Sequence, residues 1–446
     1  MTQSPQSASH RGASPQSSPQ SSPQAEAPSR TRIAAASLIG TAIEFYDFYI
    51  YGTAAALVLN TAFFPELDPL AGSLAAFSTF AVAFISRPLG SAVFGHWGDR
   101  IGRKSMLVVS LLVMGLSTVA IGLLPGHAAI GVAAPVLLVA LRFTQGIGLG
   151  GEWGGAALLA TEHAPPGRRG LYAMFPQLGP SVGFIVANGL FLVLGETLSD
   201  EQFMSWGWRL PFVASLLLVV IGLYVRLKIS ETPVFRAAMD QRRIARVPFA
   251  GLIRHQWRRV LLGAGAMTIA YTLFYTATTY CLAYGTTTLD VPRTTMLALT
   301  MIGVLFMAAG TVASSMVSDR LGRRRTLIAG TVVAIAWGLV MFPLMETGSV
   351  VLIGVALAGA LGLMGLVFGP MGAFLPELFR TEFRYSGASL AYSLGGVLGG
   401  AVPPLVATSM QAGGLGVMSV GIYVSAMAVL SLLCLLALPE TGGETL

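Results

Sequence analysis

Long apolar segments follow one another along almost the whole chain. Twelve such segments, each of more than 20 residues, lie at about 33–58, 73–95, 105–125, 131–161, 171–195, 208–228, 260–284, 294–317, 325–345, 349–375, 386–408 and 414–438. About 20 apolar residues in a helix cross the roughly 30 Å hydrocarbon core of a bilayer. Because backbone N–H and C=O groups must be paired inside lipid, such segments fold as helices. The sequence therefore predicts an all-α polytopic membrane protein with twelve transmembrane helices, surrounded by membrane lipid.

The few charged residues predict the orientation in the membrane. Only 11% of the 446 residues are charged, against about 25% in soluble proteins. The net charge of +7 is of the kind that nucleic-acid-binding proteins carry, but the basic residues lie in short connectors between apolar segments. Cytoplasmic loops are enriched in Lys and Arg, and with the N-terminus inside, 23 of the 27 Lys and Arg fall on cytoplasmic segments. We therefore expect both termini in the cytoplasm and no nucleic-acid partner.

The connectors divide the chain into domains. Residues 1–32 are rich in Ser, Pro and Gln, so they cannot bury enough apolar surface to fold and are expected to form a disordered cytoplasmic tail. An Arg-rich connector at 229–259 separates six apolar segments from the next six. We expect an N-terminal six-helix bundle at 33–228, a C-terminal bundle at 260–438 and a short cytoplasmic tail at 439–446.

The two halves repeat in sequence. "GDRIGRK" at 98–104, after the second segment, recurs as "SDRLGRR" at 318–324, after the eighth, an offset of 220. The acid and the arginine that follow the fourth segment, Glu162 and Arg169, recur after the tenth at an offset of 215. The sequence therefore predicts two pseudo-symmetric six-helix bundles of the same topology.

These motifs resemble those of a known family. The residues that match G-x-x-x-D-R-x-G-R-[KR], a loop motif of the major facilitator superfamily, are Gly95, Asp99, Arg100, Gly102, Arg103 and Lys104. Three longer stretches, "SRPLGSAVFGHWGDRIGRK", "RFTQGIGLGGEWGGAALLATEHAP" and "RYSGASLAYSLGGVLGG", are similar to signatures of its metabolite:proton symporter family, which includes carriers for shikimate, oxoglutarate, citrate, and proline with betaine. The resemblance implies proton-coupled uptake by alternating access in a bacterial inner membrane, without a cofactor.

The first apolar segment contains two carboxylates, in "IEFYDFYIYG". A charge in the bilayer centre costs roughly 2.5–3.5 kcal/mol on insertion scales, so such residues point to function. Glu44, Asp47 and Tyr51 share one helical face with Ser37 and Gly40. We expect Asp47 to bind the coupling proton, because it occupies the place of the first-helix aspartate of proton-coupled sugar carriers, with Glu44 second. Alternatively, both carboxylates only pair with arginines that hold helices together.

Two buried arginines are candidates for binding and coupling. The resemblance implies a coupling role for Arg142, which we expect to pair with Asp47, or to form a structural salt bridge, while Gln145 lies one turn away. Glu152 is expected as a second proton site, a substrate gate or a packing partner. Arg87 lies nine residues before His96, about 13 Å inside the helix end. It would neutralise an anionic substrate or hold Glu44.

Further substrate contacts are expected from polar stripes on two helices. Side chains that recur on one helical face can bind a polar substrate, although the same side chains also join helices by hydrogen bonding. The candidates are Gln177, Ser181 and Asn188 in the fifth segment and Tyr271, Tyr275 and Thr278 in the seventh.

The repeated cytoplasmic loops are expected to latch one conformation. Aspartates in these loops can pair with arginines at neighbouring helix ends when the cytoplasmic side closes, whereas a plain excess of positive charge would not explain the aspartates. The expected gating residues are Asp99, Arg100, Arg103, Glu162, Arg169, Asp319, Arg320, Arg323, Glu377 and Arg384.

Other classes of protein are disfavoured. The five histidines lie in tails or at helix ends, and there is no HExxH or GxSxG motif, so we expect neither an enzyme nor a metal site. Cys281 and Cys434 lie in separate apolar segments and are expected to pack. The glycine run "GIGLGGEWGG" lacks the strand that precedes a dinucleotide-binding loop. Its Gly146, Gly150 and Gly154 have the spacing of a close helix contact instead.

The sequence therefore predicts a proton symporter of a small polar metabolite, most readily an organic acid such as a shikimate-like or dicarboxylate anion. A proline/betaine osmolyte symporter is the first alternative. A drug or metabolite efflux antiporter is the second, because "LGPSVG", with Gly179, Pro180 and Gly183, partly resembles an antiporter signature. No obligate protein partner is evident.

Overall fold

The structure is a computed structural model of the whole chain, and it describes residues 30–101, 103–150, 152–162, 164–165, 167–228, 248–380 and 383–442. Residues 1–29 of the predicted tail and 229–247 of the predicted connector lie outside these ranges. All regular secondary structure within these ranges is helical, and no strand occurs there.

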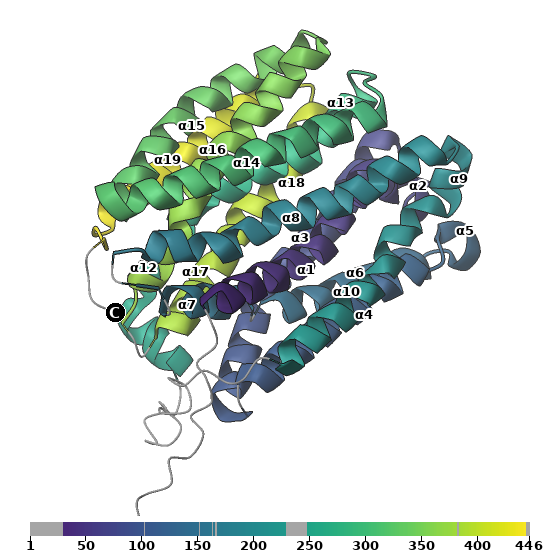
Figure 1. Ribbon diagram of the computed structural model, residues 1–446. Helices are drawn as coiled ribbons and strands as arrows, with labels where there is room; N and C mark the ends of the chain where they lie inside the picture. Colours follow the sequence, from purple (N-terminus) through teal and green to yellow (C-terminus); the bar gives the residue numbers. More distant parts are fainter. Residues whose placement is uncertain are drawn as a thin grey trace, which may run out of the picture.

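Two bundles of six membrane-spanning units make up the fold (Figure 1). The N-terminal bundle consists of α1 (Arg30–Leu57), α3 (Pro69–Ile101), α4 (Arg103–Leu123), α6 (Ala133–Leu149) continued by α7 (Trp153–Glu162), α8 (Arg169–Thr197) and α10 (Leu210–Lys228). The C-terminal bundle consists of α12 (Pro248–Tyr275) continued by a π-helical turn η2 (Thr276–Tyr280) and α13 (Cys281–Thr287), α14 (Arg293–Leu321), α15 (Arg323–Glu346), α16 (Val350–Glu377), α17 (Arg384–Gly396) continued by a second π-helical turn η3 (Val397–Ala401) and α18 (Val402–Ala412), and α19 (Met418–Ala437). Short elements α2 (Leu59–Phe63), α5 (His127–Ile130), α9 (Asp200–Ser205) and η1 (Gly207–Arg209) lie in connections.

The predicted fold class is confirmed. Ten helical spans in the described residues are long and apolar enough to cross a membrane. The helices α1 and α4, of 28 and 21 residues, complete the set of twelve. Most boundaries differ from the predicted segments by a few residues, and two differences are structural. The fourth span is divided between Leu149 and Trp153, and α12 begins at Pro248, inside the predicted connector, with a kink at Gln256 (φ −132°, ψ 15°).

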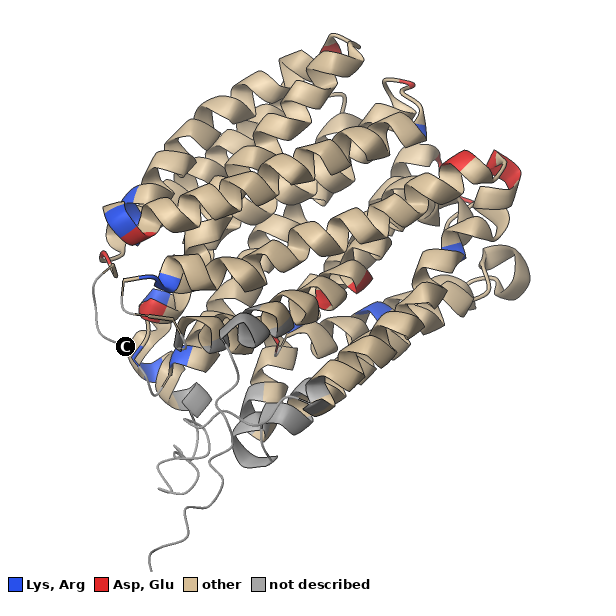
Figure 2. Cartoon of the chain, viewed as in Figure 1, with Lys and Arg blue, Asp and Glu red and all other residues tan. Residues whose placement is uncertain are grey.

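The charges separate the two ends of the molecule. The N-terminal end of α1 and the C-terminal end of α19 lie at the same end of the bundle (Figure 1). Most described Lys and Arg gather at that end, together with a few Asp and Glu, whereas acidic residues predominate at the opposite end (Figure 2). The positive-inside rule therefore places this end in the cytoplasm, and we call the two ends cytoplasmic and periplasmic below.

Glycines allow α3 and α6 to touch through their backbones. A Cβ atom at Gly146 would overlap the backbone of Ala83, and one at Gly150 would overlap the backbone of Arg87. The predicted close helix contact is confirmed for these two residues. Gly154 instead faces Ser389 of α17, in the other bundle. This packing fixes Arg87 on α3 against the end of α6.

Aromatic side chains fill the centre where the bundles meet. The ring of Phe48 on α1 lies 4.9 Å from Phe84 of α3, and Phe84 lies 5.2 Å from Tyr275 of α12, measured between centroids. Phe80 packs on the same cluster. Aromatic pairs at such distances add about 0.5–1.5 kcal/mol each to area burial. The polar residues of the site are therefore set in a rigid apolar frame.

Candidate functional site

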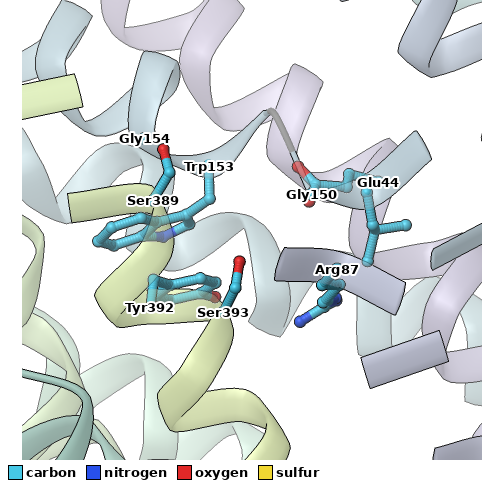
Figure 3. A pocket seen from close by; sticks show the side chains of 9 residues that line it. Glu44, Arg87, Gly150, Trp153, Gly154, Ser389, Tyr392 and Ser393 are labelled. Atoms are coloured by element: carbon cyan, nitrogen blue, oxygen red, sulfur yellow. The ribbon is translucent and has the colours of Figure 1, made fainter. Parts of the chain in front are cut away.

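A small enclosed cavity lies between the two bundles. Its volume is about 10 Å³, which is close to the space that one water molecule needs. Four parts of the chain line it: α1, α3, the break between α6 and α7, and α17 (Figure 3). The lining residues are Glu44, Arg87, Leu149, Gly150, Trp153, Gly154, Ser389, Tyr392 and Ser393. A metabolite can enter only if the bundles separate, so this conformation is closed.

Arg87 is the prominent charge of the cavity. It is only 2% exposed, and its guanidinium lies 4.5 Å and 5.0 Å from the ring centroids of Phe48 and Phe84. Within the described structure, none of its three side-chain nitrogens has a hydrogen-bond partner. The tyrosines Tyr271, Tyr275 and Tyr392 lie close enough to act on its charge. The Tyr271 hydroxyl lies within hydrogen-bonding reach of Arg87 and of Tyr392, but no well-aligned hydrogen bond forms between them. A buried guanidinium with free donors is costly unless an anion pairs with it.

Two stacked aromatic rings form one wall of the cavity and join the bundles. The rings of Trp153 on α7 and Tyr392 on α17 lie 3.8 Å apart with 7° between their planes. Trp153 Nε1 donates a hydrogen bond to Gln177 Oε1 (3.0 Å), and Gln177 Nε2 donates one to the Phe368 carbonyl of α16 (2.7 Å). Gln177, predicted as a substrate ligand, therefore supports this wall.

We expect Trp153→Ala to open this wall. Aromatic stacking is worth about 0.5–1.5 kcal/mol, so its loss should shift the closed-to-open ratio by up to about tenfold. The readout is the rate at which a thiol reagent labels Ser393→Cys in a carrier with Cys281→Ser and Cys434→Ser. Faster labelling is expected in Trp153→Ala than in Trp153→Phe, which keeps a ring. Equal rates in the two variants would contradict the prediction.

Asp47 does not pair with Arg142, contrary to the expectation from sequence. Ser215 of α10 donates a hydrogen bond to Asp47 Oδ1. On the fourth span, the Arg142 guanidinium donates to Gln145 Oε1 and to the Phe80 carbonyl, and it lies 3.7 Å from the Tyr51 ring centroid. Gln145 stands between the two charges.

The Gln145 amide group connects the two sites. Its Nε2 donates to the Asp47 carbonyl (3.3 Å) and to Thr118 Oγ1 (2.8 Å), while its Oε1 accepts from Arg142. Asp47 thus lies against α4 and α10, inside the N-terminal bundle, whereas Glu44, one turn earlier on α1, lines the cavity. Residue spacing correctly predicted that Glu44 and Asp47 are buried. It did not predict that the two carboxylates face different helices.

Some predicted substrate ligands lie away from the cavity. Asn188 accepts a hydrogen bond from Thr53 Oγ1 (2.6 Å) and so joins α8 to α1. Thr278 bonds back to the Phe274 carbonyl (2.8 Å) within its own helix. Ser181 is buried, and its hydroxyl has no partner in the described structure. Glu152 is 4% exposed at the junction of α6 and α7, next to Trp153. The substrate roles of these residues remain predictions.

Besides the apolar Leu149, four lining residues did not appear among the sequence candidates. Trp153 lies in the motif "GIGLGGEWGG". An aromatic side chain in an apolar segment does not by itself indicate a binding residue. Ser389, Tyr392 and Ser393 follow an i, i+3, i+4 spacing on α17. The polar-stripe criterion that selected residues in the fifth and seventh segments would have found them in the eleventh.

A cytoplasmic latch joins the bundles. Asp319, at the end of α14, accepts hydrogen bonds from the backbone N–H groups of Gly170 and Leu171, both at 2.9 Å. These residues start α8, where the helix dipole favours a negative charge. Arg323 pairs with Asp319 (2.6 Å) and lies 3.6 Å from Glu377.

This geometry fits the expected gating role of Asp319, Arg323 and Glu377. Arg169 lies near Glu377, Arg320 is exposed, and Arg384 is buried. The side chains of the matching residues in the first repeat, Asp99, Arg100, Arg103 and Glu162, lie outside the described part of the chain.

The C-terminal segment reinforces this latch. Glu440 accepts hydrogen bonds from the backbone N–H groups of Arg323 (2.7 Å), Arg324 (3.2 Å) and Arg325 (3.4 Å), and so caps the start of α15. Thr441 donates to Glu377 (2.7 Å). Partial burial raises the pKa of Glu440, but its backbone hydrogen bonds outweigh this effect and lower the pKa overall.

We expect Glu440→Gln to destabilise the carrier by about 1 kcal/mol at neutral pH, because a charged cap is lost. The lowered pKa means that the carboxylate stabilises the fold above its unfolded-state pKa. This stabilisation disappears as the pH falls through the folded-state pKa. Melting temperatures of the two proteins should therefore differ at pH 7 and converge in acid. A difference that persists in acid would show that the charge of Glu440 is not responsible.

A second inter-bundle contact lies at the periplasmic end. Arg293, at the start of α14, pairs with Asp200 of α9 (2.9 Å). Its guanidinium also lies 3.9 Å from the centroid of the Phe203 ring. Contacts between the two halves of the chain therefore occur at both ends of the molecule.

Two six-helix bundles with a charged cavity between them are the architecture of a membrane transport protein. The model of the Major Facilitator Superfamily matches residues 37–404, and the chain belongs to this superfamily. It is a metabolite transporter of the multi-pass, bacterial inner-membrane type and not an enzyme.

Individual relatives agree with this assignment. The chain is 50% identical over 424 residues to the inner membrane metabolite transport protein YhjE of Escherichia coli K12, covering 94% of this chain and 96% of the relative. It is 38% identical over 390 residues to the shikimate transporter of the same organism, covering 86% and 88%. Among solved structures, a partially occluded inward-open xylose transporter XylE from E. coli superposes with a TM-score of 0.73 at 19% identity, covering 94% of this chain and 99% of that chain. This last similarity supports the fold alone.

Proposed function

We propose that this carrier is a proton symporter that takes up a small organic anion. The observation that supports the proposal most strongly is the Arg87 guanidinium, which is buried, faces the cavity and has no hydrogen-bond partner in the described structure. Guanidinium groups bind carboxylates through two parallel charge-assisted hydrogen bonds. The hydroxyls of Tyr271, Tyr275 and Tyr392 supply further donors for a hydroxylated substrate.

The coupling proton is carried by the buried carboxyl groups of α1. Asp47 is the first candidate: it is completely buried, and one of its oxygens has no partner in the described structure. Glu44 is the second candidate and lies in the cavity itself. Arg142 donates a hydrogen bond to Gln145, and Gln145 donates one to the backbone carbonyl of Asp47. Arg142 therefore supports the position of Asp47 through Gln145.

Alternating access follows from the two latches. Substrate enters from the periplasm when the contact of Arg293 with Asp200 opens, and leaves to the cytoplasm when Asp319 releases the start of α8. Because both contacts join the halves, opening one while keeping the other moves the bundles about the central cavity. The cavity then faces each side in turn.

The test is uptake into proteoliposomes with and without an inward proton gradient. The labelled panel comprises shikimate, oxoglutarate, citrate, proline and betaine. We expect gradient-driven accumulation of one carboxylate. In Asp47→Asn this accumulation should be lost while substrate exchange persists, because exchange needs no net proton movement. Accumulation that ignores both the gradient and the substitution would contradict symport, and a lack of uptake for the whole panel would favour efflux.

A zwitterionic osmolyte is the second candidate substrate. The wall formed by Trp153 and Tyr392 is aromatic and next to Arg87. Aromatic faces bind quaternary ammonium groups, while the arginine would bind the carboxylate. Betaine accumulation in the same panel, with no accumulation of the anions, would select this alternative.

A further inference from the structure

Two opposite charges face the same small cavity. Glu44 comes from α1 and Arg87 from α3 (Figure 3), and each is 2% exposed. The negative charge of Glu44 acts on Arg87. Nevertheless, no nitrogen of Arg87 makes a well-aligned hydrogen bond with a described residue, although the Tyr271 hydroxyl lies within reach of the guanidinium. The guanidinium therefore has a nearby carboxylate for charge balance and keeps its donors free.

We propose that Glu44 is an internal counter-ion of Arg87, and that the carboxylate of a monocarboxylate substrate displaces it and thereby makes Glu44 take up a proton. This inference rests on the anion site at Arg87 in the proposed function. It specifies the substrate class of that site and assigns the coupling proton to Glu44, the second candidate above, instead of Asp47. In the step, one O–H bond forms on Glu44 and no bond of the substrate breaks. The substrate carboxylate forms its hydrogen bonds with the guanidinium of Arg87.

The exchange has a simple electrostatic cause. An ionised carboxylate is stable in a buried site only while a positive partner balances it. When Arg87 binds the substrate anion, it compensates the charge of Glu44 less. Protonation of Glu44 then removes the excess negative charge. Proton and substrate therefore enter the cavity together, because Arg87 can balance only one anion.

The number of available cations limits the substrate to one carboxylate. Arg87 is the cation that lines the cavity. The next buried arginine, Arg142, already donates to Gln145 and to the Phe80 carbonyl and lies over the Tyr51 ring. A second substrate carboxylate would meet hydroxyls and aromatic rings from the described residues without a further cation, at the desolvation cost of an unpaired charge.

The other titratable groups around the pair can be named. Tyr49 of α1, Tyr271 and Tyr275 of α12 and Tyr392 of α17 surround it. Tyrosine titrates near pH 10 in water, so these hydroxyls stay protonated at physiological pH. Two more acids of the N-terminal bundle require explicit tests. Glu152 lies beside the lining residue Trp153, and Asp47 faces α4 and α10.

The test is isothermal titration calorimetry on the purified full-length carrier. Shikimate, a monoanion, and glycine betaine, a zwitterion with one carboxylate, are the probes. Titrations in two buffers of different ionisation enthalpy give the number of protons taken up per ligand. For shikimate we expect about one proton near neutral pH and an affinity that rises as the pH falls. Betaine brings its own positive charge into the cavity, so it should bind with fewer protons than shikimate. In Glu44→Gln we expect almost no proton uptake per ligand and an affinity that does not depend on pH. Glu44→Ala is a second variant with the same expectation.

A matched control and the contrary outcomes separate this inference from the proposed function. Glu196→Gln makes the same acid-to-amide change at an exposed position of α8 and should take up protons like wild type. Shikimate binding to wild type without proton uptake, or unchanged proton uptake in Glu44→Gln, would overturn the proposed protonation of Glu44 and leave the Arg87 site standing. Proton uptake that is lost in Asp47→Asn or Glu152→Gln but kept in Glu44→Gln would also overturn the assignment to Glu44. No binding of any compound from the uptake panel would overturn both proposals.

Discussion

Arg87→Gln is expected to lower the uptake efficiency, kcat/KM, by about 100-fold or more. The loss of charge-assisted hydrogen bonds to a carboxylate costs roughly 3 kcal/mol, and every 1.4 kcal/mol corresponds to about a tenfold change. Arg87→Lys keeps the charge but loses the planar fork, so about a tenfold reduction is expected for it. Initial rates of labelled substrate uptake, normalised to the amount of folded carrier, measure both effects.

The melting temperature distinguishes a binding role from a structural one. Since Arg87 is buried without a hydrogen-bond partner in the described structure, its charge does not stabilise the closed state through hydrogen bonds. Its replacement, however, leaves the buried Glu44 carboxylate without its counter-ion, which destabilises the protein until Glu44 binds a proton. We therefore expect the melting temperature of Arg87→Gln to lie below that of wild type at neutral pH and to approach it in acid. A difference in melting temperature that persisted in acid would show that Arg87 holds helices together instead. Arg258→Gln, at an exposed position of α12, is the control.

Gly146→Val should prevent the N-terminal bundle from packing. A side chain at this position would overlap the backbone of Ala83 and the hydroxyl of Ser86 on α3. A backbone neighbour cannot rotate away, so the helices must separate. Overpacking of this kind costs roughly 3 kcal/mol or more. The expected result is a large fall in melting temperature and in the yield of monodisperse protein, both measured by size-exclusion chromatography with a heating step.

The control for this prediction is Gly40→Val. Gly40 also lies in a membrane-spanning helix, α1, but a Cβ atom there would have no neighbour within 4 Å. The same chemical change should therefore leave the melting temperature close to that of wild type. If the two variants melted alike, the close contact of α3 with α6 would not be the cause.

Much of the fold follows from local rules that a single sequence contains. Segment length and the distribution of Lys and Arg predicted twelve helices and their orientation, since each rule depends on one helix and its own flanks. The depth of Arg87 in its helix could also be computed from residue spacing. These rules describe one helix at a time, so they predicted the length of each helix and the depth of a residue within it.

The site depends on which helix faces meet, and the spacing within one helix does not contain that information. Glu44 and Asp47 were assigned to one face, yet one lines the cavity and the other bonds to Ser215 of α10. The stack of Trp153 on Tyr392 joins two residues from different halves of the chain. Only the packed structure shows this contact. The predicted pair of Asp47 with Arg142 failed for the same reason, because Gln145 occupies the space between them.

The two π-helical turns give the C-terminal half a different mechanical character from the N-terminal half. η2 follows Tyr275, and η3 begins four residues after Ser393. Each turn contains an extra residue that can shift along its helix and so acts as a joint. The corresponding first helix of the other half, α1, is continuous from Arg30 to Leu57. In the proposed transport cycle, the two turns would let the outer parts of the seventh and eleventh spans bend over the bound metabolite, while α1 moves as one straight unit.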